Sequence, residues 1–235
     1  MPDKDYKVYT AHLKDGRKWC SPFIDSSIIF WALSFVDKHK RYIDIISPGD
    51  VIFDVGATTG EYTIPAALAA GKKGKIYAFE PNPITFYCMK ANASLYGVRV
   101  SGFMLALSDV GGKKTKLYTE SDGVSGESMI KKYRPGKKIP INVTTETLDN
   151  FCHNHNINNI DVLKITVNGY DPKVLAGALK TLPNVHYVLI QTYPDPALES
   201  SRILKENGFE CREVITYQEK GKDVYNGIVM LFERV

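Results

Sequence analysis

Short apolar runs separated by longer mixed segments organise most of this chain. Such runs predict strands near residues 51–55, 75–80, 98–105, 161–167, 185–191, 211–217 and 227–232. Between them, apolar residues at helical spacing predict helices near residues 60–70, 83–96, 148–155, 172–181 and 196–207. Strands that alternate with helices indicate an α/β fold, in which a mostly parallel sheet carries helices on both faces.

The segments before and inside this alternation add smaller elements. Residues 6–20 alternate in polarity and predict a hairpin, and the apolar stretch 28–36 predicts a short helix. Because turn residues follow at 47–50, we expect an N-terminal extension over residues 1–48 and one α/β domain over residues 49–235. Further strands are expected at residues 115–118 and 139–145.

The most informative motif joins the first two strands of the alternation. Asp54-Val55-Gly56-Ala57-Thr58-Thr59-Gly60 follows one apolar run, and Glu80 closes the next. A strand, a glycine turn, a helix and a second strand ending in an acid form a nucleoside pocket, where the acid holds the ribose hydroxyls. Dinucleotide loops have the spacing G-x-G-x-x-G, which admits a pyrophosphate. The spacing here is G-x-x-x-G, so the loop favours S-adenosyl-L-methionine; a dinucleotide and a plain strand-to-helix turn are the remaining interpretations.

Helix-end signals surround this motif. Thr58 and Glu61 have the spacing of a capping box, so the helix after the loop is expected to begin near Thr59, with Pro65 as a kink beyond its first turn. Pro83 suits the first position of the next helix, with Asn82 as its cap.

The carboxyl ends of the predicted strands select candidate site residues, because ligands of parallel sheets bind beyond those ends. The positions are Asp54, Gly56, Glu80, Ser108, Asp109, Thr166, Asn168, Gln191, Thr192 and Tyr193. By the same rule His186, at the start of its strand, belongs to the opposite edge. We interpret it, together with His153 and His155, as structural or solvated.

Composition limits the class of protein. The chain has 235 residues, 44% of them hydrophobic, and a net charge of +4. It lacks the apolar core of a signal peptide and any run of 18 apolar residues, so we expect a soluble, cytoplasmic protein without a membrane partner. Four scattered cysteines suggest neither a zinc site nor a disulfide framework, and no metal is expected.

Positive charge gathers in one segment. Between Lys113 and Lys138 there are eight basic and three acidic residues, and Pro135-Gly136 marks a loop at its densest part. Such a run is usually a solvated loop. The functional alternative is that it steers an anionic substrate or a nucleic acid toward the site.

Five motifs in order resemble the FkbM family of S-adenosylmethionine-dependent methyltransferases. They are D-V-G-A-T-T-G-E-Y-T (54–63), F-E-P-N-P (79–83) with Asn92 following, A-L-S-D-V-G-G (106–112), T-L-D (147–149) and D-V-L-K-I-T-V-N-G-Y-D-P-K-V-L-A-G-A (161–178). The resemblance covers about residues 48–192. It implies a Rossmann-like class I methyltransferase fold of seven strands, the last of them antiparallel, and O-methylation of a hydroxyl on a small molecule or sugar.

The resemblance also implies roles for the cofactor residues. Glu80 would accept hydrogen bonds from both ribose hydroxyls, Asp109 would accept from the adenine amino group, and Ser108 would border the ring. Asp54 and the loop backbone would face the methionine part. The full expected set is Asp54, Gly56, Ala57, Thr58, Gly60, Tyr62, Glu80, Pro81, Asn82, Ser108 and Asp109. Alternatively, Asp109 is a turn residue and Glu80 a plain strand-end acid.

The acceptor side departs from the family. The family pattern K-I-D-V-E-G-x-E becomes Lys164-Ile165-Thr166-Val167-Asn168-Gly169-Tyr170-Asp171, so two acids are replaced by neutral residues. Asp171 keeps a carboxylate, as a base or as the cap of a helix beginning at Pro172. Lys164 is expected to point away from the cofactor. The candidates for handling the acceptor are Asp171, Tyr170, Thr166 and Asn168, with Thr192 and Tyr193 nearby.

Three functions stay open at this level. The first is a methyltransferase acting on a small-molecule or sugar acceptor, in which orientation carries much of the catalysis. The second is an RNA (tRNA) methyltransferase, favoured by the basic segment and by E-P-N-P, although an N-P-P-Y or D-P-P-Y segment is missing. The third is a cofactor-binding protein that has lost catalysis, favoured by Thr166 and Asn168. The sequence does not indicate an oligomeric state.

Overall fold

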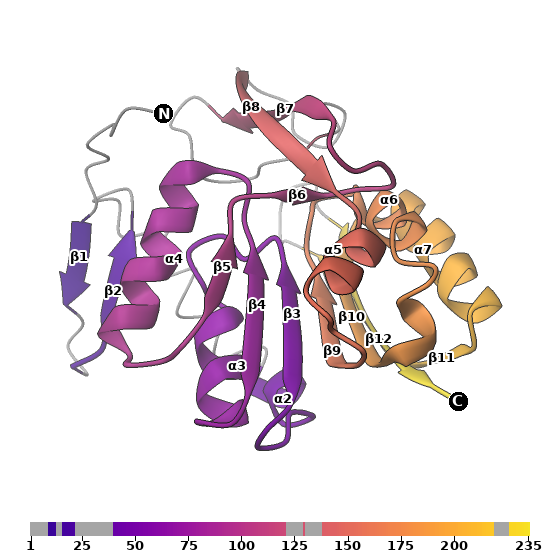
Figure 1. The fold of residues 1–235 in the computed structure, drawn as a ribbon, viewed down its shortest axis with the longest axis horizontal. Coiled ribbons are helices and arrows are strands. Elements are labelled where there is room, and N and C mark those ends of the chain that lie inside the picture. The colour runs from indigo at the N-terminus through magenta and orange to yellow at the C-terminus, as the bar shows by residue number, and fades with distance from the viewer. Residues whose placement is uncertain (1–8, 13–15, 22–39, 121–128, 130–137, 219–225) are drawn as a thin grey trace.

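A seven-stranded sheet forms the centre of the computed structural model, which describes residues 9–12, 16–21, 40–120, 129, 138–218 and 226–235 (Figure 1). The strand order is β11-β12-β10-β9-β3-β4-β5, and β12 alone runs against its neighbours. The strands are β3 (Val51–Val55), β4 (Lys75–Phe79), β5 (Ser101–Phe103), β9 (Ile160–Ile165), β10 (Val185–Thr192), β11 (Phe209–Gln218) and β12 (Asn226–Arg234). The predicted α/β fold with a mostly parallel sheet is confirmed.

Helices cover both faces because the buried strands are apolar on both sides. Alternation in β3 shows this: Ile52 packs in one core cluster, and Phe53 and Val55 in another. The first cluster contains residues of α2 (Lys40–Ile43) and α3 (Thr63–Ala70). The second contains residues of α5 (Leu148–Asn154), α6 (Asp171–Ala176) and α7 (Pro194–Glu206). Helix α4 (Pro83–Leu95) packs on the α3 side through Phe86 and Met89, and a short 3-10 helix, η2 (Leu182–Asn184), precedes β10.

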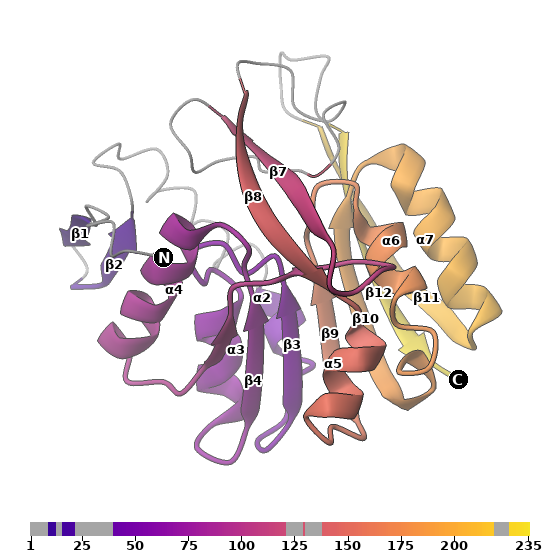
Figure 2. The same ribbon diagram turned by 45° about the horizontal axis from the view of Figure 1, so that its top comes forward.

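A second, smaller sheet crosses the carboxyl-end edge of the main sheet (Figures 1 and 2). It consists of β6 (Ala106–Leu107), β8 (Lys138–Glu146) and β7 (Lys114–Glu120), in that spatial order. Strands β7 and β8 are the two extra strands expected on either side of the basic loop. Most of that loop, including Lys131, Lys132 and Lys137, lies outside the described residues.

The N-terminal hairpin is also confirmed, as β1 (Tyr9–His12) paired with β2 (Lys18–Ser21). The helix expected at residues 28–36 lies outside the described residues. Helix α2 falls within the predicted extension, yet its Tyr42 is buried in the same core cluster as Ile52. The domain boundary at residue 48 stays a prediction.

The predicted start of the helix after the glycine loop, near Thr59, is wrong. Helix α3 begins at Thr63, and its N-cap residue, Tyr62, makes no side-chain cap hydrogen bond. The capping box does not form, because the Thr58 N–H donates to Glu80 Oε2 at 2.8 Å and Thr58 lies in the left-handed region at φ 51°. Pro65 therefore lies in the first turn, where a missing N–H leaves no helical bond unmade. At α4 the prediction holds: Asn82 Oδ1 accepts from the Ile84 N–H at 3.0 Å, with Pro83 at the first position.

Candidate functional site

The glycine loop is fixed between the ends of three strands. The N–H groups of Gly56 and Ala57 both donate to the Phe79 carbonyl at the end of β4, at 2.9 and 3.1 Å. Gly56 has φ 80°, and a Cβ atom there would lie 2.0 Å from the Thr166 carbonyl oxygen just after β9. Only glycine fits this conformation and this close approach. The first glycine of the motif is therefore required by backbone packing.

Glu80 joins this loop to the start of α4. Its Oε2 accepts from the Thr58 N–H at 2.8 Å, and its Oε1 accepts from the Asn82 N–H at 2.9 Å. The residue is 3% exposed, and burial raises the pKa of its carboxyl group. A carboxylate has about four acceptor positions, and besides these two N–H groups the Thr85 hydroxyl interacts with Glu80, so capacity for a ligand hydroxyl remains. Its donors and its place beyond β4 fit a nucleoside cofactor.

A buried ion pair supports the loop from β9. Lys164 Nζ lies 2.7 Å from Asp54 Oδ1 and donates to the Gly56 carbonyl at 2.9 Å. Asp54 also accepts from the Thr63 hydroxyl and is fully buried. We expected Lys164 to point away from the cofactor, and this stays a prediction; in the structure its ammonium group contacts the glycine loop at the Gly56 carbonyl. The contact arises from the register of β3 with β9, in which Asp54 and Lys164 are paired residues.

Ser108 and Asp109 meet the acceptor-side residues directly. Ser108 Oγ lies 2.9 Å from Asp109 Oδ1 and 3.0 Å from the Tyr170 hydroxyl. Asp109 Oδ2 forms an ion pair with Lys173 at 2.7 Å, and this contact lowers the pKa of Asp109. The structure thus brings a predicted cofactor pair and a predicted acceptor residue into one hydrogen-bonded group. Lys173 was missed in the sequence, where nothing distinguishes it from a solvated lysine.

Thr166 and Asn168 occupy a tight turn after β9. Asn168 has φ 51° and the following Gly169 has φ 90°, both in the left-handed region. Asparagine tolerates this region better than other non-glycine residues. The Thr166 hydroxyl is buried without a hydrogen-bond partner among the described residues. An unsatisfied buried hydroxyl costs about 1 to 3 kcal/mol, so this hydroxyl is a candidate for binding an acceptor.

Asp171 is not the helix cap that the sequence offered as one of its two roles. It is the first residue of α6, where it does not serve as a side-chain cap, and it is fully buried. Its Oδ1 accepts from the Thr192 hydroxyl at 2.6 Å, and its Oδ2 accepts from the Ser200 hydroxyl at 2.7 Å. Burial raises the pKa of this carboxyl group. The expected cap is wrong, and the contacts show a connection between α6, the end of β10 and α7.

The N-terminal hairpin contacts the glycine loop through Thr59. The Trp19 indole N–H donates to Thr59 Oγ1 at 3.0 Å, and Asn92 Nδ2 donates to the Thr59 carbonyl at 2.8 Å. Asn92 also bonds both backbone groups of Cys20, at 2.6 Å to the N–H and 3.0 Å to the carbonyl. Sequence reasoning noted Asn92 only as part of a motif and missed Trp19 and Thr59.

Among the described residues, no group of three or more His, Cys, Asp or Glu side chains is arranged to hold a metal ion. No helix in that part of the chain is both long and apolar enough to cross a membrane.

Comparison with known proteins gives matches over different lengths. The chain is 25% identical to the 2-O-methyltransferase NoeI of Sinorhizobium fredii over 72% of this chain and 74% of that protein. It is 25% identical to the hexuronic acid methyltransferase AglP of Haloferax volcanii over 67% of this chain and 62% of that protein. A tRNA (guanine(37)-N(1))-methyltransferase of Leishmania major is 38% identical over 38% of this chain, which spans 12% of that protein.

Structural similarity agrees at the level of the fold. Trm5b from Pyrococcus abyssi superposes with a TM-score of 0.54 at 13% identity, over 98% of this chain and 56% of that chain.

The family model of the methyltransferase FkbM domain matches residues 54–223. This match covers the glycine loop, Glu80, Ser108-Asp109 and the turn after β9. The chain therefore belongs to the FkbM family of S-adenosylmethionine-dependent methyltransferases.

Proposed function

We propose that this protein transfers a methyl group from S-adenosyl-L-methionine to a hydroxyl of a small molecule or sugar. The observation that carries the proposal is the joint placement of Glu80 and the glycine loop at one strand-end edge, with Ser108, Asp109 and Tyr170 hydrogen-bonded together. The relatives that match over most of their length support it. One is named a 2-O-methyltransferase and the other a hexuronic acid methyltransferase.

The residues divide the work between binding and orientation. Glu80 would hold the ribose hydroxyls, Asp109 the adenine amino group, and the loop from Gly56 to Gly60 the methionine part. When bound, the cofactor supplies a methyl group on a sulfonium, which is a good leaving group. Tyr170 and the buried hydroxyl of Thr166 would orient the acceptor. Orientation alone is worth roughly 7 to 11 kcal/mol, whereas a general base adds about 10² to 10⁴ in rate.

Within this proposal the acceptor is anionic and is attracted by the basic segment between Lys113 and Lys138. Exposed Lys114 and Lys116 on β7 belong to the small sheet at the carboxyl-end edge. Methylation of tRNA is less well supported, because the chain spans only 10% to 16% of the first tRNA methyltransferases that it matches. A cytoplasmic location stays a prediction.

The test is methyl transfer by the purified chain from radiolabelled cofactor to sugars, hexuronic acids and a tRNA transcript. We expect transfer to a hydroxyl of a sugar or sugar acid. Glu80→Ala should weaken cofactor binding at least ~10-fold, because it removes charge-assisted hydrogen bonds worth about 1.5 to 3 kcal/mol each.

Glu80→Gln serves as a second variant, since it keeps the shape of the buried side chain and loses its charge. Exposed Glu206→Ala is the matched control and should bind cofactor as the wild type does. Calorimetry showing equal affinity in wild type, Glu80→Ala and Glu80→Gln would remove Glu80 from the site. Transfer to tRNA and to no sugar would reverse the order of the proposals.

A further inference from the structure

A groove lined with positive charge lies at the amino-end edge of the main sheet, away from the glycine loop. Its five cations are Lys72, Lys73, Lys75, Lys90 and Arg99, and we refer to it as the basic groove. The hollow has a volume of about 700 Å³. Its lining comes from the turn before β4, from α4 and from the segment leading into β5, and it contains no acidic residue.

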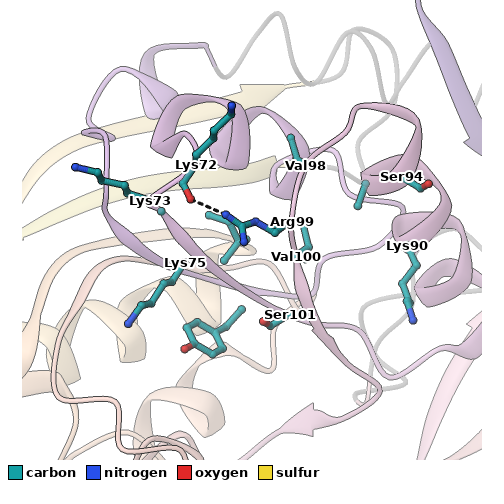
Figure 3. A pocket seen from close by; sticks show the side chains of 13 residues that line it. Lys72, Lys73, Lys75, Lys90, Ser94, Val98, Arg99, Val100 and Ser101 are labelled. Carbon is teal, nitrogen blue, oxygen red and sulfur yellow. Dashed lines mark hydrogen bonds between the residues drawn. The ribbon is translucent and has the colours of Figure 1, made fainter.

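The cations of the basic groove have no carboxylate partner in the part of the chain that the structure describes, and Lys90 Nζ lies 5.9 Å from the centre of the Phe86 ring. One Arg99 N–H group donates to the Lys72 carbonyl at 3.0 Å, which fixes the guanidinium among the lysines (Figure 3). Arginine has five N–H donors, so most of them stay available. Five like charges around one hollow repel each other, and a polyanion would relieve that repulsion.

The arrangement suits a row of phosphates. Lysine presents a point charge on a flexible stem, which positions a phosphate backbone without reading sequence. In Figure 3, Lys72, Lys73 and Lys75 lie on one side of Arg99 and Lys90 on the other, so a single phosphate would leave several cations unpaired. Half-buried Val98 and Val100 provide apolar surface between the charges for a sugar or base. A concave surface also favours a strand over a flat bilayer.

The basic groove is separate from the proposed methyl-transfer site. Strand β4 runs from Lys75 at the groove to Phe79, next to Glu80. At about 3.3 Å per residue, Lys75 and Glu80 lie roughly 16 Å apart. A sugar-sized acceptor cannot occupy both places. A ligand of the basic groove is therefore either a second molecule or a long polymer.

We propose that the basic groove binds the phosphate backbone of a single-stranded nucleic acid. This binding site goes beyond the proposed methyl transfer and does not depend on it. The cations on the turn before β4, on α4 and on the segment before β5 would each contact phosphate oxygens. Binding would be weakly sequence-dependent and strongly salt-dependent.

The test is fluorescence anisotropy of a labelled single-stranded RNA of mixed sequence with the full chain, without cofactor, over a range of salt concentrations. The groove variant is Lys72→Ser/Lys73→Ser/Lys90→Ser. It leaves Arg99 in place, because Arg99 bonds the backbone. The matched control, Lys18→Ser/Lys180→Ser/Lys205→Ser, removes the same charge from exposed positions outside the groove and outside the basic segment between Lys113 and Lys138. We expect the groove variant to bind at least ~10-fold more weakly at low salt, with a log–log salt slope smaller by about 2, and the control to match the wild type.

Three results would overturn the proposal. The first is equal weakening in both variants, which would indicate a response to net charge alone. The second is unchanged binding in the groove variant while its thermal unfolding matches the wild type. The third is tighter groove-dependent binding of poly-glutamate, phosphatidylserine vesicles or inorganic pyrophosphate than of RNA, which would assign the groove to an acidic protein, a membrane or a small phosphate. Methyl transfer enters none of these measurements, so failure here leaves the proposed function untouched.

Discussion

At the scale of single residues, the turn after β9 holds the two positions where this chain departs from the family pattern. Asn168 lies in the left-handed region, where a bulkier side chain costs roughly 1 to 2 kcal/mol. Thr166 keeps a buried hydroxyl without a partner among the described residues. The two positions carry acids in the family pattern that the sequence resembles. This chain therefore has a polar but uncharged surface where its relatives could remove a proton.

Restoring the acids tests this hypothesis. Thr166→Asp/Asn168→Glu should raise the rate on a hydroxyl acceptor, by up to about 10² to 10⁴ if a general base is what the chain lacks. Cofactor affinity should stay the same. Stability should fall by about 1 kcal/mol, because Asn168→Glu places a longer side chain in the left-handed region. Steady-state kinetics, calorimetry and thermal unfolding measure the three quantities.

The control for stability is Thr166→Val, which removes the unpartnered hydroxyl at nearly equal volume. Its free energy of unfolding should equal or exceed that of the wild type. The hypothesis that the chain lacks a general base would be contradicted if the wild type turns over fast and the double replacement does not raise its rate. Orientation would then be the whole mechanism.

Residue identities could be predicted where a local rule applies. Glu80, Asn82 and Gly56 follow from strand ends, a helix cap and a turn, and each has the predicted position. The partners of Lys164 and Asp171 could not be predicted in the same way. They arise from the register of β3 with β9 and from the packing of α6 against α7, which join residues far apart in the sequence.

At the scale of elements, hydrogen bonds join the N-terminal hairpin to the glycine loop. Asn92 on α4 bonds Cys20 of β2 and the Thr59 carbonyl of the loop, and all three contacts are buried. The hairpin and Asn92 therefore hold the loop at Thr59, while Glu80 bonds it at the neighbouring Thr58. The sequence showed both elements but not their contact. The capping-box pattern at Thr58 and Glu61 also gave a wrong prediction of where the helix begins, because the Thr58 N–H donates to Glu80 instead of Glu61.

Removing this link should affect the fold and cofactor binding together. Asn92→Ala leaves a buried N–H and two buried carbonyls without partners, so we expect a loss of roughly 2 to 4 kcal/mol in the free energy of unfolding. Cofactor affinity, measured by calorimetry below the unfolding temperature, should fall as the loop loses its anchor. Asn92→Asp keeps the acceptor for the Cys20 N–H but places a carboxylate oxygen against the carbonyls of Cys20 and Thr59, so it should be at least as destabilising as Asn92→Ala. Reduced stability with unchanged cofactor affinity would show that the hairpin only stabilises the fold.

At the scale of the whole molecule, several acids are buried in the part of the chain that the structure describes. Glu61, Glu80 and Asp171 are all buried, and burial raises the pKa of each. For Glu61 the pKa rises from 4.5 to about 7, despite hydrogen bonds from the Thr59 N–H and hydroxyl. A raised carboxyl pKa means that the folded state binds more protons than the unfolded state between those two values. Stability then falls as pH rises through that window.

We therefore expect the protein to be more stable near pH 5 than near pH 8. The loss of stability due to Glu61 is zero below about pH 4.5, where the group is protonated in both the folded and the unfolded state. It reaches its full size above about pH 7, where the group is ionised in both states. Its size is on the order of 3 kcal/mol. Thermal unfolding of Glu61→Gln across this range should show a smaller decrease with pH than the wild type, because the amide keeps the shape of the side chain and cannot ionise. Exposed Glu206→Gln is the control and should follow the wild type. Identical pH profiles for wild type and Glu61→Gln would show that Glu61 is ionised in the folded protein at no cost, supported by Lys164 and Thr59.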